Sequence, residues 1–185
     1  TDIDRTNLSE LVGLVRELNL KGHSPATSGN YSIRSSDDLN CAYVSESGFD
    51  KSTFTEMNFI PLDINSEKKI IETDTRKTSD ETEVHLAIYR KTNAGCVLHS
   101  HMQSSLLFCD LYKGKAFADI KNLELLKGFS GVKTHDTSIQ IPIFENTQDI
   151  TTLSKIIEPS LTLDKNCYAI LLQGHGIYVF GKSVK

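Results

Sequence analysis

Two histidines stand one residue apart, His99 and His101, directly after the apolar run of the stretch "AGCVLHSH". If this stretch is a β-strand, residues two apart project from the same face, so both imidazoles point the same way. Imidazole is a common ligand of zinc and other divalent metals, and two of them on one strand can meet one ion. The alternative is that one of the pair is a core or solvated histidine, because H-x-H by itself is a weak signal.

A third histidine, His175, lies between Gly174 and Gly176, in a short break between two strongly apolar runs. Glycine on both sides permits a tight turn and a close approach of the backbone. A histidine at the mouth of a buried hairpin is well placed to be a third ligand, and three histidines with an open position are typical of catalytic zinc. The alternative is that the glycines only make the turn and that His175 faces water. The remaining histidines are interpreted as structural or solvated: His23, His85 and His135.

Apolar spacing predicts helices and strands that alternate along the chain. Several strand pairs are joined by tight turns, which indicates an α/β layered domain around a mixed or antiparallel sheet. Helices are expected over residues 7–22, 79–93, 102–114, 122–129 and 149–161. Strands are expected around 30–34, over 41–47 and 94–101, as a hairpin over 58–73, as an extended stretch over 140–147, and on either side of the Gly-His-Gly break in 167–183.

Length and charge limit the class of protein. The 185 residues suffice for one domain with a sizeable core, so the chain is interpreted as a single domain over residues 1–185. The net charge of −4 argues against general binding to nucleic acid or to anionic membranes. No apolar run approaches the ~20 residues of a membrane helix, and the N-terminal stretch "TDIDRTNLSE" has no signal-peptide pattern. The four cysteines form no C-x-x-C pair, so we expect reduced thiols and a cytoplasmic protein.

Several stretches together resemble the class II aldolase/adducin family. They are "TSGNYSIR", "SGFDKS", "TSDETEVHLAIYR", "VLHSH" and "LLQGHGIYVFG", in the order of the family and over nearly the whole chain. Two further stretches, "LELLKGF" and "IPIFENT", resemble the dehydratases of methionine salvage within that family more than its sugar-phosphate aldolases. The resemblance implies a three-layer α/β/α fold with a central, mainly antiparallel sheet. Members of the family usually continue with a C-terminal helix beyond the last strand, whereas this sequence ends at "GKSVK". The resemblance also implies a homotetramer with active sites near subunit interfaces. One Zn²⁺ per subunit would be held by His99, His101 and His175.

Two glutamates are candidates for proton transfer by the same resemblance. Glu81 matches the catalytic glutamate of the aldolases, and Glu124 in "LELLKGF" matches the acid/base of the dehydratases. Glu81 could instead assist the metal as a ligand, or simply complement the positive end of the predicted helix. The alternative for Glu124 is a solvated helix face.

The resemblance also implies a phosphate site made of turn residues. Backbone N–H groups in a glycine-containing turn, together with a helix N-terminus, can hold an anion. The alternative is that these are ordinary turn and capping residues. Asp80 stands where the aldolases have a serine and is expected to point away, and Lys51 and Lys77 are possible charge partners. The predicted phosphate-binding residues are Thr27, Ser28, Gly29, Asn30, Ser47, Gly48 and Ser79, the last as the N-cap of a helix.

The leading functional hypothesis is zinc-dependent dehydration of a small sugar phosphate. The resemblance implies that 5-methylthioribulose 1-phosphate loses water to give 2,3-diketo-5-methylthiopentyl 1-phosphate, with Glu124 as the favoured acid/base. An aldolase or epimerase would use the same metal and the same enediolate chemistry. A third hypothesis is a non-catalytic, adducin-like interaction domain, although such members lose the metal histidines that this chain keeps.

Overall fold

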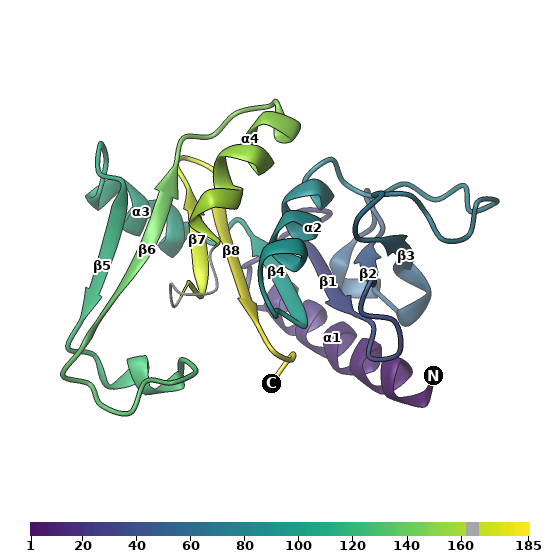
Figure 1. Cartoon of the computed structure of the whole chain (residues 1–185), viewed down its shortest axis with the longest axis horizontal. Coiled ribbons are helices and arrows are strands. Elements are labelled where there is room, and N and C mark those ends of the chain that lie inside the picture. Colours follow the sequence, from purple (N-terminus) through teal and green to yellow (C-terminus); the bar gives the residue numbers. More distant parts are fainter. Residues whose placement is uncertain (162–166) are drawn as a thin grey trace.

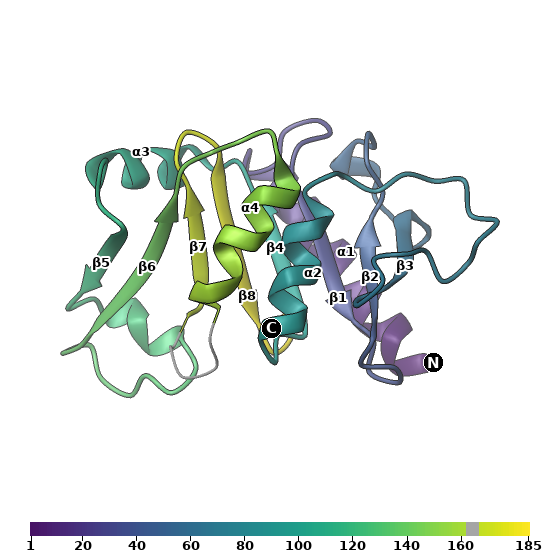
Figure 2. The ribbon, with the colours of Figure 1, turned by 45° about the horizontal axis from the view of Figure 1, so that its top comes forward.

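The computed structural model describes residues 1–161 and 167–185. A sheet runs through the middle of the molecule, and helices cover both of its faces (Figures 1 and 2). The helices are α1 (Asp2–Leu20), α2 (Thr82–Lys91), α3 (Gln103–Leu111) and α4 (Ile150–Ile157), with a 3₁₀ segment η3 at Glu124–Gly128. The strands are β1 (Asn30–Arg34), β2 (Cys41–Ser45), β3 (Phe59–Asp63), β4 (Cys96–Ser100), β5 (Phe117–Lys121), β6 (Ser138–Phe144), β7 (Ala169–Leu172) and β8 (Gly176–Gly181).

The strands form one eight-stranded sheet in the order β3-β2-β1-β4-β8-β7-β6-β5. All neighbouring pairs are antiparallel except β6 and β7, which run parallel. The predicted three-layer α/β/α fold with a mainly antiparallel sheet is therefore confirmed. None of the helices within 1–161 and 167–185 is both long and apolar enough to span a bilayer.

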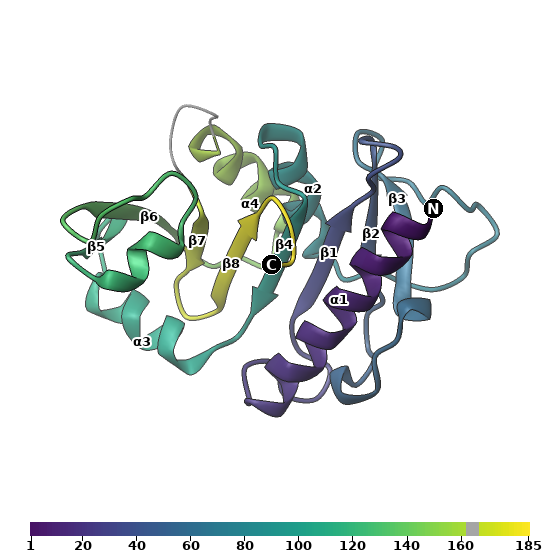
Figure 3. The same ribbon diagram turned by 90° about the horizontal axis from the view of Figure 1, so that it is seen from below.

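Two helical layers bury the two faces of the sheet. On one face α1 lies across β1 and β2 (Figure 3), and its stripe of Leu11, Val12 and Val15 packs into the core. On the other face α2 and α4 lie side by side, and Val84 and Leu153 belong to one buried cluster with strand residues. This apolar packing fixes the strand ends on which the candidate chemistry depends.

The structure corrects several boundaries. Helix α1 begins five residues before the predicted start, at Asp2. The expected hairpin over 58–73 consists of β3 alone, followed by a loop that returns only as one bridge between Leu62 and Lys69. The predicted helix over 122–129 is the 3₁₀ segment η3, and β5 was not predicted because its short sequence "FADIK" carries two charges and weak alternation.

The start of α2 also differs from the prediction. The regular α-helix begins at Thr82, with Glu81 in the N-cap position. Ser79 lies two residues earlier, where its Oγ accepts a hydrogen bond from the Glu81 backbone N–H at 3.3 Å, as a capping serine does. Ser and Thr hydroxyls favour such local turns ahead of helices. Glu81 is thereby held at the mouth of the helix, facing the end of the sheet.

Candidate metal centre

The sheet register brings the three separated histidines to one place. His99 lies in β4, and His101 follows the end of that strand. The neighbouring strand β8 runs antiparallel to β4, with Ser100 opposite Ile177, so the end of β4 meets the start of β8. His175 lies in the turn just before β8. Pairing of β4 with β8 therefore places all three imidazoles together, where the end of β4 meets the start of β8 in the middle of the sheet.

The glycines around His175 have separate roles. Gly174 has a backbone φ of +69°, which makes the turn and is strained for other residues. A Cβ on Gly176 would lie 2.3 Å from the carbonyl oxygen of Ser100, so only glycine permits this approach of β8 to β4. The close backbone contact expected from the sequence is present, and it brings His175 next to His101.

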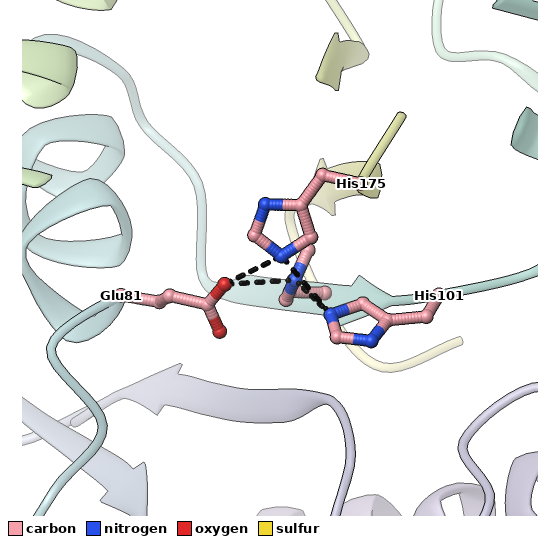
Figure 4. A group of neighbouring side chains, drawn as sticks. Glu81, His101 and His175 are labelled. Carbon is pink, nitrogen blue, oxygen red and sulfur yellow. Dashed lines mark hydrogen bonds and ion pairs between the residues drawn. The ribbon is translucent and has the colours of Figure 1, made fainter. Parts of the chain in front are cut away.

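Four side chains converge on one point, as Figure 4 shows for the labelled residues. The Nε2 atom of His101 lies 3.0 Å from Nε2 of His99 and 3.1 Å from Nε2 of His175. The Oε1 atom of Glu81 lies 2.7 Å from Nε2 of His175 and 3.5 Å from Nε2 of His99. All four donor atoms lie within 4.8 Å of one another. Ligand atoms around a tetrahedral zinc ion are roughly 3.3 Å apart for Zn–N bonds of about 2.0–2.1 Å, so the donor set fits a divalent metal.

Contacts behind the cluster fix two of the imidazoles. His99 donates its Nδ1–H to the carbonyl oxygen of Ile177 at 3.0 Å, and His175 donates its Nδ1–H to Oδ1 of Asn146 at 3.0 Å. The proton on Nδ1 leaves the Nε2 lone pair free to bind a metal. Tyr178, opposite His99 in the sheet, stacks on its ring at a centroid distance of 4.1 Å and restrains its orientation.

The cluster is partly withdrawn from water, and this shifts its protonation. Burial alone would raise the pKa of the Glu81 carboxyl, but the hydrogen bonds and charges of His175 and His99 outweigh burial and hold that pKa well below its usual range. Burial, together with His99 and His175, lowers the pKa of His101 to about 4. Glu81 is thereby kept as a carboxylate and His101 as a neutral imidazole, which are the forms that bind metal ions.

A small cavity of about 100 Å³ adjoins the cluster and is lined in part by Glu81 and His101. Six of the seven residues predicted to bind phosphate line it, namely Thr27, Ser28, Gly29, Asn30, Ser47 and Ser79. The seventh, Gly48, lies in the exposed turn after Ser47, where its φ of +81° reverses the chain. Asp80 is exposed and Lys77 points to solvent, so neither belongs to the lining.

Lys51 also lines this cavity and is 1% exposed. Its Nζ donates to the carbonyl oxygens of Thr27 at 3.1 Å and Phe49 at 3.0 Å, which ties the two turns together. Among residues 1–161 and 167–185, no carboxylate forms an ion pair with this ammonium. Burial lowers the pKa of Lys51 to about 8, because the charged form is poorly solvated. The ammonium also lies over the Phe54 ring at 4.8 Å. A buried cation beside a cavity, without a carboxylate partner among the described residues, favours an anionic ligand.

Glu124 is not brought to this cluster within its own chain. It lies in η3, between β5 and β6, and its side chain is 71% exposed. Its carboxylate pairs instead with Lys127, and with Nδ1 of His135 at 3.5 Å. In Figure 2 the η3 segment and the β7–β8 turn lie at opposite ends of the sheet.

Sequence reasoning missed two residues that hold the histidines. Asn146 belongs to the stretch "IPIFENT", which was used only for the resemblance, and it contacts His175. Tyr178 was interpreted only as part of an apolar strand, yet it stacks on His99. The polar Asn146 directly after an apolar strand was the one signal that pointed toward a site.

A model of the family described as Class II Aldolase and Adducin N-terminal domain matches residues 9–185. The chain belongs to this family. Proteins named methylthioribulose-1-phosphate dehydratase are similar over most of their length. The relative from Stenotrophomonas maltophilia (strain R551-3) is 37% identical over 98% of this chain and 84% of its own. The relative from Xanthomonas campestris pv. campestris (strain 8004) is 35% identical over 94% of this chain and 78% of its own.

Solved structures of the class II aldolase fold are similar at low sequence identity. The l-fuculose-1-phosphate aldolase from Thermus thermophilus has a TM-score of 0.69 and 21% identity, covering 96% of this chain and 80% of that chain. YgbL from Escherichia coli has a TM-score of 0.79 and 16% identity, covering 98% of this chain and 81% of that chain. At these sequence identities the solved structures support the fold alone. The family predicted from the motifs is confirmed by the family model and by the more similar relatives.

Proposed function

We propose that this chain is a zinc-dependent lyase, a dehydratase that converts 5-methylthioribulose 1-phosphate to 2,3-diketo-5-methylthiopentyl 1-phosphate and water. One observation carries the proposal: Glu81 and three histidines converge beside a small polar cavity that contains a buried lysine. The names and identities of the relatives support the choice of dehydration over other chemistry of the same family.

His99, His101 and His175 would hold the metal, with Glu81 as a fourth ligand or as its neighbour. A divalent ion bound there supplies Lewis acidity, which polarises a carbonyl and makes the adjacent C–H easier to ionise. The contacts of His99 with Ile177 and of His175 with Asn146 keep the ring nitrogens aimed at the centre. The protein thus supplies orientation before the substrate arrives.

The cavity beside the cluster is proposed as the phosphate site. Its turns offer hydroxyl groups and backbone N–H groups, and Lys51 supplies a positive charge that has no carboxylate partner among the described residues. A phosphate held there is remote from the reacting carbons and fixes their position relative to the centre. A dianion would also offset the desolvation of the Lys51 ammonium.

Glu124 remains our proposed acid/base, taking the C3 proton or protonating the C4 hydroxyl as it leaves as water. Because its side chain is exposed and distant from the cluster of its own chain, we propose that it serves the centre of a neighbouring subunit in a homotetramer. Glu81 is the alternative base, since its Oε1 already faces the three histidines.

The test is a product assay with methylthioribulose 1-phosphate, followed by mass spectrometry on protein of known metal content. Loss of one water, abolished by His99→Ala and by Glu124→Gln, is the expected result. Asp136→Asn is the matched control, because it removes an exposed carboxylate from the same β5–β6 connection. Intact substrate at full zinc occupancy would overturn the dehydratase.

Aldol cleavage or C4 epimerisation is the second candidate function. The fold neighbours include an l-fuculose-1-phosphate aldolase. Aldol cleavage would remove the proton of the C4 hydroxyl and break the C3–C4 bond, and it would give an enediolate that the same metal could stabilise. Cleavage of fuculose, rhamnulose or ribulose phosphates, without dehydration of the methylthio sugar, would favour this assignment. Failure to bind any divalent metal would favour the adducin-like interaction domain.

A further inference from the structure

A row of buried polar groups runs inward from Glu81, away from the metal centre. Asn30 is 4% exposed, His85 and Ser32 are 0% exposed, and Tyr89 is 2% exposed. Such groups are costly to bury unless each finds a hydrogen-bond partner. Apolar residues of similar size would fill this space between β1 and α2 at no such cost, so the row calls for an explanation beyond packing.

The row follows from two simple spacings. Glu81, His85 and Tyr89 recur every four residues at the start of α2 and along it, which places them on one face of the helix. Asn30 and Ser32 alternate on β1 and point toward that face. The helix stripe and the strand stripe interlock, because each strand residue hydrogen-bonds two members of the helix stripe.

The hydrogen bonds connect without a gap. Nδ2 of Asn30 donates to Oε2 of Glu81 at 2.6 Å, and Oδ1 of Asn30 lies 2.7 Å from Nε2 of His85. Nδ1 of His85 lies 2.8 Å from Oγ of Ser32, and that oxygen lies 2.8 Å from the hydroxyl of Tyr89. Five side chains are therefore linked from the metal centre to the interior.

Only one set of proton positions satisfies this row when His85 is neutral. The amide oxygen of Asn30 can only accept, so Nε2 of His85 must carry the proton. Nδ1 of His85 must then accept from the Ser32 hydroxyl, which in turn accepts from Tyr89. Burial, with the charge of His99 as a smaller cause, lowers the pKa of His85 to about 3, which keeps the ring neutral.

The tautomer of His85 and the Glu81 carboxylate favour the same orientation of the Asn30 amide. In the reversed orientation, the amide oxygen would face the Glu81 carboxylate, which is repulsive for either tautomer of His85. The amide N–H would also face Nε2 of His85, which is repulsive while Nε2 carries the proton, so this proton helps to hold the observed orientation. That orientation occupies Oε2 of Glu81 and leaves Oε1 directed at the histidines, 2.7 Å from Nε2 of His175.

We propose that His85 is a positioning residue, which turns the Asn30 amide and through it aims Oε1 of Glu81 at the metal centre. The inference rests on the proposed function only in requiring that the centre binds a metal. It assigns a role to a histidine that the sequence alone marked as structural. It also gives Asn30 a role toward Glu81 in addition to any contact with phosphate.

The test compares His85→Gln with His85→Leu, using Co²⁺ alone as the probe. Glutamine can place an N–H near the position of Nε2, whereas leucine fills the space without a donor. We expect Co²⁺ affinity, measured by competition with a chelator, to fall about 10–100-fold in His85→Leu. The visible d–d band of the bound ion should shift in the same variant. Both properties should stay close to wild type in His85→Gln.

A destabilised core is separated from lost positioning by Val84→Ala, a buried change in the same helix. This control should lower the melting temperature and leave the Co²⁺ band unchanged. If His85→Leu does not fold, Ser32→Ala replaces it, because it removes the donor that fixes the His85 tautomer; a weaker metal site is again expected. Wild-type Co²⁺ binding in both His85 variants, or equal weakening in both, would overturn the proposal. A chain that binds Co²⁺ as expected yet dehydrates nothing would refute only the proposed function.

Discussion

The metal-centre end of the sheet and the β5–β6 arm are built differently. At the centre, β4, the β7–β8 turn and the start of α2 meet, and four donor atoms lie within 4.8 Å of one another. The arm, defined here as residues 117–144, reaches the rest of the sheet through only two register pairs between β6 and β7. Leu123, just before η3, and Leu125 within it are exposed to solvent, the latter at 86%.

This difference between the two regions separates metal binding, which one chain can complete, from proton transfer by Glu124, which we propose needs a second chain. The candidate metal-binding cluster is complete within this chain, because Glu81, the three histidines and the groups that contact them all lie in the same fold. The arm carries Glu124 and exposed leucines away from the cluster of its own chain, which fits a segment that acts on another subunit. Variants in the cluster and in the arm can test whether metal binding depends on one chain and proton transfer on two.

The largest effect is expected from His99→Ala. Loss of a buried ligand should release the metal and lower kcat/KM by more than about a thousand-fold, because several kcal/mol of Lewis-acid stabilisation disappear. The measurements are the metal content, by mass spectrometry, and the rate of product formation. His23→Ala changes a histidine outside the cluster and is the control; it should keep its metal content and its activity. Full metal content in His99→Ala would contradict the assignment of the centre.

Glu124→Gln should lower activity by about 10²–10⁴-fold while leaving metal content and melting temperature unchanged. The exposed carboxylate contributes little to stability, so its effect should be confined to chemistry. A subunit-mixing experiment sharpens the comparison: oligomers that combine His99→Ala chains with Glu124→Gln chains should regain activity, because some centres then have all their ligands and an intact Glu124 from the neighbour. No recovery in verified mixed oligomers would place the action of Glu124 within its own chain.

Asn146→Ala should weaken metal binding about 10–100-fold, because it removes the acceptor that fixes the His175 ring. The measurement is a chelator competition with Zn²⁺. Asn122→Ala, on the arm, is the matched control and should bind Zn²⁺ like wild type. Equal affinity in both variants would mean that the turn alone orients His175.

The last effect concerns the pH dependence of stability rather than activity or metal binding. The pKa of Lys51 falls from 10.5 to about 8 on folding, so between these values the unfolded chain holds a proton that the folded chain has lost. Stability should therefore rise with pH across this window, by on the order of 3 kcal/mol. Urea unfolding at several pH values should show this rise in wild type and in the exposed-lysine control Lys113→Met, and not in Lys51→Met. A rise that persists in Lys51→Met would mean that another group is responsible.

Local patterns in the sequence were enough for much of the fold and for the histidines. H-x-H on a strand and Gly-His-Gly between two apolar runs depend on spacing that a single sequence displays. The apolar runs and turns predicted a mixed or antiparallel sheet, but not the order of its strands, because β1 pairs with β4 and β4 with β8 across long stretches of chain. Weakly patterned segments such as β5 were also missed, because Ala118 is its one buried residue and packs in a cluster with residues of α3, β6 and β7.

The supporting contacts could not be read in the same way. Asn30 meets Glu81 across 51 positions, and Asn146 meets His175 across 29. No local periodicity marks such pairs, because they arise when separate elements dock. The placement of Glu124 was harder still, since its predicted role depends on a surface that one chain does not supply.

Gly176 has a consequence for how such sequences are inherited. A descendant with alanine at this position would retain Glu81 and all three histidines, yet its methyl group would lie 2.3 Å from the carbonyl oxygen of Ser100. The two strands would have to separate, and the ligands they carry would separate with them. A survey of genomes that counts only ligands would score that descendant as active. The glycine after the third histidine is therefore part of the signature of a working gene, although it binds nothing itself.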